Sequence, residues 1–233
     1  MFGGLVPWYD RMNRYMTLGL DGRWRRAAAI VAQPKGALIL DLGSGTGDLA
    51  RALERAGAAR VVRADFSGPM LAADRRKAAA RDESPPTALR ADALRLPFPD
   101  ATFDAVTSGF LLRNLVDLAV GLEEMLRVLK PGGRLVALDI THAPPGPLAP
   151  ASRFVFHRVA TGVAARLSGN RKAYGYLSRS LDGYPGAKAL AQMLTDAGAL
   201  NVRYRLMGAG TIALHSARRS ASPTAPSDAE AAT

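Results

Sequence analysis

The sequence predicts an α/β domain whose mostly parallel, seven-stranded sheet ends in an antiparallel hairpin and carries helices on both faces. Short apolar runs alternate with helical stretches about every 25 residues between positions 38 and 140, which is typical of parallel sheets. A glycine-rich loop, residues 43–47, joins the first apolar run to the first helical stretch. Near the C-terminus, two strand-like segments are separated only by residues 208–210, and so short a link permits only an antiparallel hairpin.

Strands are expected where short apolar runs stop at a glycine, a proline or an acid. The run 38–42 is the first of five, and the others are 60–64, 87–91, 103–108 and 134–140. Helices are expected over 48–56, 69–80 and 117–129, and again over 188–197. The Pro-Gly-Gly stretch at 131–133 should stop the third helix, because neither residue type favours a helix interior. The fourth helix leads into the hairpin, whose strands are expected at 201–207 and 211–217.

The composition bounds the class of protein. The chain has 233 residues, 48% of them hydrophobic, which suffices for a single domain that we place at 1–219. Residues 220–233 are rich in alanine, serine, proline and threonine and predict a disordered tail. The lack of cysteine excludes disulfides, thiolate zinc sites and cysteine nucleophiles, and the three scattered histidines suggest no metal site. A membrane-spanning run and a signal peptide are both missing, so a cytoplasmic location is expected.

The glycine loop and three acids form the first candidate site. Asp41 precedes a Gly-x-Gly-x-Gly loop at 43–47, a spacing that differs from a dinucleotide fingerprint and from a P-loop. Asp65 and Asp92 end the next two strands, where the first can accept hydrogen bonds from ribose hydroxyls and the second from an adenine amino group. An acid ahead of the loop favours a cationic ligand, so S-adenosylmethionine fits all three positions. The alternative is a loop that serves only as a structural turn.

The motif order resembles that of class I S-adenosylmethionine-dependent methyltransferases, which share a Rossmann-like fold. The N-terminal signature of the C-methyltransferases of ubiquinone and menaquinone biosynthesis is similar to three parts of this chain: residues 9–13, residues 16–19 and Trp24. Residues 127–141 are similar to the second signature of that family. The Leu112-Arg113-Asn114 triplet and residues 210–215 also match. The resemblance covers nearly everything except the tail.

The resemblance implies a methyl transfer from S-adenosylmethionine to a ring carbon of a prenylated hydroquinone, most simply demethylmenaquinol to menaquinol, without a metal. Residues 1–30 would form a lid over the site. The implied cofactor-binding residues are Asp41, Gly43, Gly45, Thr46, Gly47, Asp65, Phe66, Asp92, Ala93 and Gly109.

Methylation of a ring carbon requires loss of a phenolic proton, so the site needs a proton acceptor. The candidate catalytic residues are Arg113, Asn114 and Tyr9, with Asp10 and His142 also near the expected pocket. Arg113 would stabilise the developing phenolate, and Asn114 would orient a water. The competing interpretations are structural: the Arg113-Asn114 pair could form a helix cap and a salt bridge, and Tyr9 could be plain core packing.

The chain departs from the family pattern at several positions. Asp21 stands where the family usually has histidine, Asp139 replaces a glutamate, Thr141 replaces a serine, and Gly109 lies where a serine often contacts the cofactor. Residues 180–185 replace a more polar segment. Because of these departures, another small lipid or phenol remains an alternative methyl acceptor. RNA methylation is disfavoured, because the chain carries no RNA-binding module and no amino-group site after the fourth strand.

The positive charge is concentrated in one segment. The net charge is +11, and residues 142–182 contain six lysines and arginines before the first acid, Asp182. We interpret 142–182 as a basic helical insertion above the carboxyl ends of the strands. It could rest on anionic lipid at the inner face of the cell membrane and admit a prenylated quinol, or it could be only a solvated cap. Nucleic acid is not expected as a partner, and a homodimer is left open.

Overall fold

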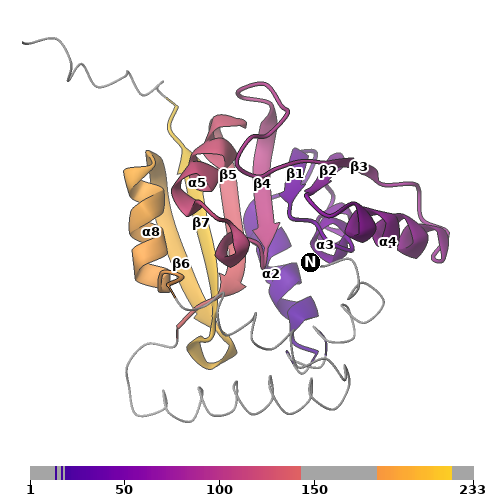
Figure 1. Ribbon diagram of the computed structural model, residues 1–233, viewed down its shortest axis with the longest axis horizontal. Helices are drawn as coiled ribbons and strands as arrows, with labels where there is room; N and C mark the ends of the chain where they lie inside the picture. The colour runs from indigo at the N-terminus through magenta and orange to yellow at the C-terminus, as the bar shows by residue number, and fades with distance from the viewer. Residues whose placement is uncertain (1–13, 15–16, 18, 143–182, 222–233) are drawn as a thin grey trace, which may run out of the picture.

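The computed structural model describes residues 14, 17, 19–142 and 183–221. A seven-stranded sheet forms its centre, with strand order β3-β2-β1-β4-β5-β7-β6 (Figure 1). The strands are β1 (Leu38–Leu42), β2 (Arg60–Asp65), β3 (Thr87–Arg90), β4 (Phe103–Gly109), β5 (Leu129–Ile140), β6 (Ala199–Met207) and β7 (Ile212–Arg219). Only β7 is antiparallel to its neighbours, β5 and β6. The predicted mostly parallel sheet with a terminal antiparallel hairpin is confirmed.

Helices cover both faces of the sheet, as predicted. They are α2 (Asp21–Ala32), α3 (Asp48–Arg55), α4 (Gly68–Ala79), α5 (Leu118–Arg127) and α8 (Ala187–Asp196), with the short 3-10 helices η2 (Leu112–Asn114) and η3 (Gly208–Gly210). One core cluster joins α5 and α8 to one face of the sheet, and a second joins α2 and α3 to the other. Alternate residues of β5 supply the two cores: Leu135 and Ala137 the first, Val136 and Leu138 the second.

The expected start of the fifth strand was wrong. β5 begins at Leu129, which pairs with Phe103, whereas the sequence pattern placed a helix up to residue 129 and the strand at 134–140. The Pro-Gly-Gly stretch therefore lies within an irregular strand, and the register shifts between Phe103 and Ala105. Gly133 permits the irregularity, since a Cβ there would lie 2.7 Å from the Lys130 carbonyl oxygen.

The described part of the N-terminal region contains a helix that packs on the sheet, and most of the expected lid lies outside the described residues. Residues 21–32 form α2, which packs against β4 and β5 and buries Ala28, Ala29 and Ala32 almost completely. This stretch belongs to the core because small alanine side chains let the helix approach the sheet closely. Tyr9 and Asp10 lie outside the described residues, as do the basic insertion beyond residue 142 and most of the expected tail.

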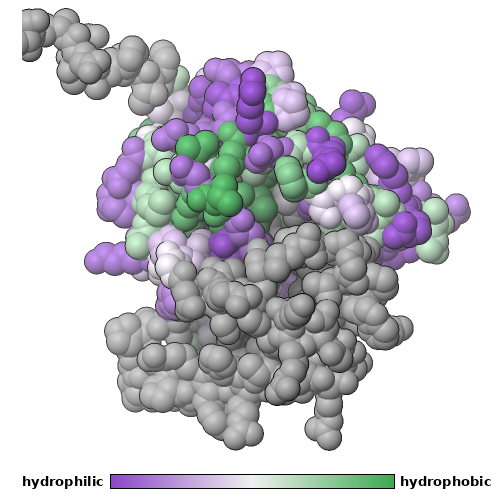
Figure 2. All heavy atoms as spheres, viewed as in Figure 1, coloured by the Kyte–Doolittle hydropathy of each residue, from purple (hydrophilic) through white to green (hydrophobic). Residues whose placement is uncertain are grey.

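The face of the described part seen in Figure 2 carries both polar and apolar side chains. Figure 2 shows hydrophilic side chains over much of one face and apolar side chains gathered around α5, next to which Val116 is 93% exposed. None of the described helices is long and apolar enough to cross a membrane.

Candidate functional site

The carboxyl ends of β1, β2 and β4 bring the predicted site residues to one edge of the sheet. Leu42 of β1 pairs in register with Ala64 of β2 on one side and with Ser108 of β4 on the other. The segments that follow these three strands therefore start side by side. The glycine loop follows β1, Asp65 ends β2, and Gly109 ends β4. This edge is where open parallel sheets bind ligands.

The three glycines of the loop differ in what surrounds them. All three have positive φ, +66° at Gly43, +56° at Gly45 and +79° at Gly47. A Cβ on Gly43 would lie 2.8 Å from Leu111, and one on Gly47 would lie 2.3 Å from an Asp74 carboxylate oxygen. Among the described residues, a Cβ on Gly45 would meet nothing within 4 Å. The first and third glycines are therefore required by the packing of the chain itself, and the middle one faces open space that a ligand can take.

Asp65 holds the loop in place. Its Oδ2 accepts a hydrogen bond from the Gly45 amide and its Oδ1 one from the Ser67 amide, both 2.8 Å long. Burial raises the pKa of Asp65, although the hydrogen bonds from these two amides act to lower it. Each carboxylate oxygen can accept a second hydrogen bond, so the side chain is still able to receive ribose hydroxyls.

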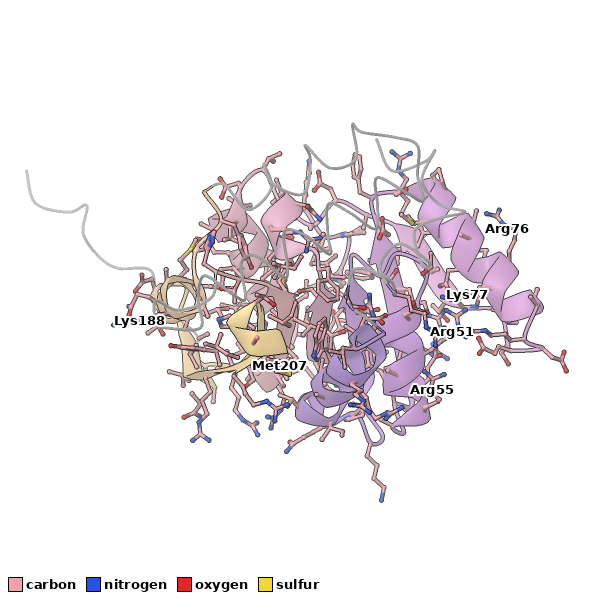
Figure 3. All side chains as sticks on the ribbon, turned by 90° about the horizontal axis from the view of Figure 1, so that it is seen from below. Arg51, Arg55, Arg76, Lys77, Lys188 and Met207 are labelled. Atoms are coloured by element: carbon pink, nitrogen blue, oxygen red, sulfur yellow. The ribbon has the colours of Figure 1, made fainter. Side chains whose placement is uncertain are left out.

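A buried ion-pair network, which the sequence did not reveal, supports the loop from behind. Asp74 on α4 pairs with Arg51 at 2.8 Å and with Arg63 at 2.7 Å, and all three side chains are at most 3% exposed. Arg51 also donates a 2.8 Å hydrogen bond to the carbonyl oxygen of Thr46. Lys77 lies beside Arg51 (Figure 3) and contacts the Thr46 hydroxyl at 3.5 Å. The charged Arg63 inside a buried strand was the one signal in the sequence that such a network exists.

Asp41 offers a buried carboxylate oxygen to a ligand. Its side chain is almost fully buried, and its Oδ1 accepts a 2.9 Å hydrogen bond from the Thr107 hydroxyl. Among the described residues, Oδ2 has no hydrogen-bond partner. Burial raises the pKa of Asp41 to about 7, although the Thr107 hydroxyl, the charges of Arg25 and Arg63 and the Ala50 amide oppose the shift. An orphaned acceptor of this kind suits an ammonium or hydroxyl donor.

Phe66 and Asp92 follow the neighbouring strands β2 and β3. Phe66 is 64% exposed, and the Arg90 guanidinium lies 5.1 Å from its ring centre and donates to its carbonyl oxygen at 2.9 Å. Asp92 is exposed, with Oδ1 accepting from the Leu94 amide at 3.0 Å, and Ala93 beside it is buried. The pair supplies an aromatic face and a carboxylate, which are the groups needed to stack a base and accept from its amino group.

Gly109 lies close to a cationic side chain from α2. A Cβ there would lie 3.2 Å from the Arg25 guanidinium and 3.3 Å from Leu49. Arg25 reaches this position from α2 and lies 5.2 Å from the Phe110 ring centre. A larger residue at this position would require Arg25 or Leu49 to shift by a few tenths of an ångström.

Arg113 and Asp139 form an ion pair across the end of the sheet. Arg113 Nη1 lies 2.5 Å from Asp139 Oδ1, and the Arg113 amide lies 3.4 Å from Oδ2. The two side chains are 11% and 3% exposed. Asn114 donates a 3.2 Å hydrogen bond to the Phe110 carbonyl oxygen. The salt bridge considered from the sequence therefore exists, and it fixes the guanidinium beside β5.

Two buried hydroxyls near this pair were missed at the level of sequence. Tyr184 is 8% exposed and Thr141 is 5% exposed, and within the described ranges neither hydroxyl has a hydrogen-bond partner. Burial, followed by the Asp139 charge, raises the pKa of Tyr184. His142 bonds through Nε2 to the Tyr184 carbonyl oxygen at 3.2 Å, which makes His142 a structural link.

His215 is also structural. Its Nε2 lies 2.8 Å from the Ala187 carbonyl oxygen at the start of α8, and burial lowers its pKa. In the part of the chain that the structure describes, no group of three or more histidines, aspartates or glutamates could hold a metal ion.

Comparisons with known proteins identify the relatives of this chain. Residues 1–219 match the model of the ubiE/COQ5 methyltransferase family. A demethylmenaquinone methyltransferase from Thermus thermophilus is 48% identical over 217 residues, which cover 92% of this chain and 98% of the relative. A protein of the same name from Deinococcus radiodurans is 44% identical, with 90% and 87% covered. The ubiquinone/menaquinone biosynthesis C-methyltransferase UbiE of Desulfotalea psychrophila is 39% identical, with 92% and 87% covered.

Solved structures support the fold alone. A putative methyltransferase in complex with the Haloferax volcanii Trm112 activator has a TM-score of 0.64 at 19% identity, covering 94% of this chain and 98% of that one. A putative methyltransferase from Bacillus halodurans has a TM-score of 0.61 at 19% identity, with 84% and 98% covered. The fold is therefore the one expected from the sequence.

Proposed function

This chain belongs to the ubiE/COQ5 methyltransferase family, and on that premise we propose that it methylates demethylmenaquinol to menaquinol. It is an S-adenosylmethionine-dependent methyltransferase that acts on a ring carbon of a prenylated quinone precursor. The finer choice of demethylmenaquinol rests on the names of its relatives from Thermus and Deinococcus, which both specify demethylmenaquinone.

The described residues fit S-adenosylmethionine. We assign the orphaned Oδ2 of Asp41 to the ammonium group and the Asp65 carboxylate to the ribose hydroxyls. The exposed Phe66 ring and the Asp92 carboxylate are assigned to the adenine. The open space at Gly45 leaves room for the ligand to approach the loop backbone. When bound, S-adenosylmethionine supplies an electrophilic sulfonium methyl group.

Methylation of a ring carbon of a quinol requires the protein to stabilise a phenolate. Loss of a phenolic proton would make the ortho carbon of the acceptor nucleophilic toward the methyl group that S-adenosylmethionine would supply, with S-adenosylhomocysteine as the leaving group and the displaced ring proton passing to water. Arg113, fixed by Asp139, is placed to stabilise the negative charge on the ring oxygen. Arg113 cannot act as a base at neutral pH, so we assign the proton to a water oriented by Asn114.

The single observation that supports methyl transfer at this site is that the Gly45–Asp65 contact and the Arg113–Asp139 pair both lie at the carboxyl ends of the parallel strands. The test is a methyl-transfer assay with labelled S-adenosylmethionine, offering reduced demethylmenaquinone and a demethyl ubiquinone precursor in detergent. Label on the naphthoquinol ring carbon supports the proposal. Label only on the ubiquinone precursor would change the pathway, and binding of S-adenosylmethionine without transfer to either would favour another lipid or phenolic acceptor.

We further propose peripheral contact with the inner face of the cell membrane, because the prenyl tail of the acceptor is insoluble in water. The basic residues of the sequence between 142 and 182 and the apolar surface around α5 are the features that support it. Sedimentation with anionic and neutral liposomes at low salt tests this contact. A homodimer is a second proposal, which analytical ultracentrifugation tests.

A further inference from the structure

We propose that the hydroxyl groups of Tyr184 and Thr141 bind a ring oxygen of the acceptor beside the Arg113–Asp139 pair. The ligand is a phenolic or quinol hydroxyl group. This inference rests on the proposed function, which it deepens by naming the residues that hold the acceptor.

The first support is that both hydroxyls are buried without a partner. Tyr184 is 8% exposed and Thr141 is 5% exposed, and neither hydroxyl has a hydrogen bond within the described ranges. Buried polar atoms in native proteins are nearly always satisfied, and exceptions call for an explanation. Two exceptions close to one ion pair are explained together if a ligand supplies the missing partners.

The second support is the convergence of three chain segments. The Thr141 amide bonds to the Thr211 carbonyl oxygen at 2.8 Å, which continues the antiparallel pairing of β5 with β7 by one residue. Thr141 lies two residues beyond Asp139, and alternate residues of an extended segment share a face, so we place both side chains on the same face. Tyr184 lies just before α8, tied by its carbonyl oxygen to His142 at the end of β5. Tyr184 also packs in the same core cluster as Leu112, the neighbour of Arg113.

The third support is chemical. The pKa of Tyr184 is raised by burial and then by Asp139, so the phenol stays protonated at physiological pH and remains a hydrogen-bond donor. Asp139 already accepts from Arg113 and from the Ile140 amide at 2.8 Å. A neutral hydroxyl donor beside a fixed guanidinium suits an oxygen that becomes negatively charged, since hydrogen bonds to an anion are stronger than those to a neutral oxygen.

The test substitutes Tyr184→Phe and Thr141→Val, with Tyr204→Phe and Thr195→Val as matched controls on the exposed surface of β6 and α8. We expect each site variant to raise the KM for reduced demethylmenaquinone about tenfold, with the Kd for S-adenosylmethionine unchanged. The Tm of Tyr184→Phe should stay equal or rise, because the change removes a buried hydroxyl that lacks a partner in the free protein. Equilibrium dialysis with 1,4-dihydroxynaphthalene measures acceptor binding without turnover.

The outcomes separate this inference from the proposed function. Wild-type binding of 1,4-dihydroxynaphthalene that weakens in both site variants supports the oxygen site, even if methyl transfer to demethylmenaquinol fails and the proposed function falls. Unchanged KM and unchanged dialysis in both variants would overturn the inference while methyl transfer stands. A weaker Kd for S-adenosylmethionine in the site variants would also overturn it, because the hydroxyls would then serve the cofactor. Absence of naphthalenediol binding to the wild type would overturn it as well.

Discussion

The backbone amide of Gly45 donates a 2.8 Å hydrogen bond to Oδ2 of Asp65, at the end of the neighbouring strand. Asp65 therefore has two tasks: it shapes the loop, and it presents its remaining lone pairs to the ligand. The contact also explains why the loop amide points toward the carboxyl end of β2. A substitution of Gly45 should therefore alter the position of the Asp65 carboxylate, and a substitution of Asp65 should alter the conformation of the glycine loop.

Replacing Asp65 by alanine should weaken S-adenosylmethionine binding by about 100-fold or more. The variant loses the carboxylate proposed to bind the ribose and the acceptor that orients the Gly45 amide, and hydrogen bonds to charged groups contribute about 1.5–3 kcal/mol each. Isothermal titration calorimetry measures the Kd. Asp196→Ala, at an exposed position on α8, is the matched control. Affinity that equals the wild type would refute the assignment of Asp65.

Alanine at Gly45 and at Gly47 should have opposite consequences for fold and ligand. Gly45→Ala places a methyl group in open space, so we expect a stability loss of only about 1 kcal/mol from the positive φ, together with a strong loss of cofactor binding. Gly47→Ala would bring a methyl group against Asp74, so we expect a loss of about 3 kcal/mol or more in the free energy of unfolding.

Urea denaturation of both variants in the absence of ligand measures the difference, and calorimetry gives the affinity of whichever variant folds. If Gly45→Ala binds S-adenosylmethionine as the wild type does, the ligand does not approach the loop at this residue.

The pH dependence of cofactor binding should report Asp41. Its pKa, raised to about 7 chiefly by burial, leaves the carboxyl increasingly protonated as the pH falls, and a protonated carboxyl attracts an ammonium group less. We expect the affinity for S-adenosylmethionine to fall about fivefold from pH 7 to pH 6, the ratio of the ionised fractions. In Asp41→Asn the affinity should be weak and nearly constant over this range.

The same shift has a consequence for stability. The folded pKa of Asp41 lies above its unfolded value of 3.8, so the folded state binds more protons between these values. The contribution of this group is therefore fully present below about pH 4 and is lost as the pH rises to about 7. Denaturation of the ligand-free wild type and of Asp41→Asn across this window checks the sign, and a wild type whose stability rises with pH relative to the variant contradicts it.

The sequence predicted the parts of the fold and site that depend on local pattern. The apolar run 38–42, the glycine spacing and the acids Asp65 and Asp92 each lie within one strand or loop, and parallel pairing then places them at one edge. The charged Arg63 in an expected strand indicated a buried partner, but Arg51 and Asp74 could not be identified as its network, because α3, β2 and α4 meet only in three dimensions. The orphaned hydroxyls of Thr141 and Tyr184 were missed for the same reason, since nothing in a single sequence marks a hydroxyl as unpaired.

Asp139 should act as a positioning residue for Arg113. Asp139→Asn keeps the size of the side chain and removes the charge that fixes the guanidinium, so we expect kcat for methyl transfer to fall about 10- to 100-fold while the Kd for S-adenosylmethionine stays unchanged. Asp139→Glu should restore much of the rate, because a longer carboxylate can still pair with Arg113. The control is Asp104→Asn, which breaks the exposed pair with Lys130 far from the acceptor. Equal rates in Asp139→Asn and the wild type would show that the pair serves the fold alone, whereas a loss that Asp139→Glu rescues would tie the charge of Asp139 to the chemistry.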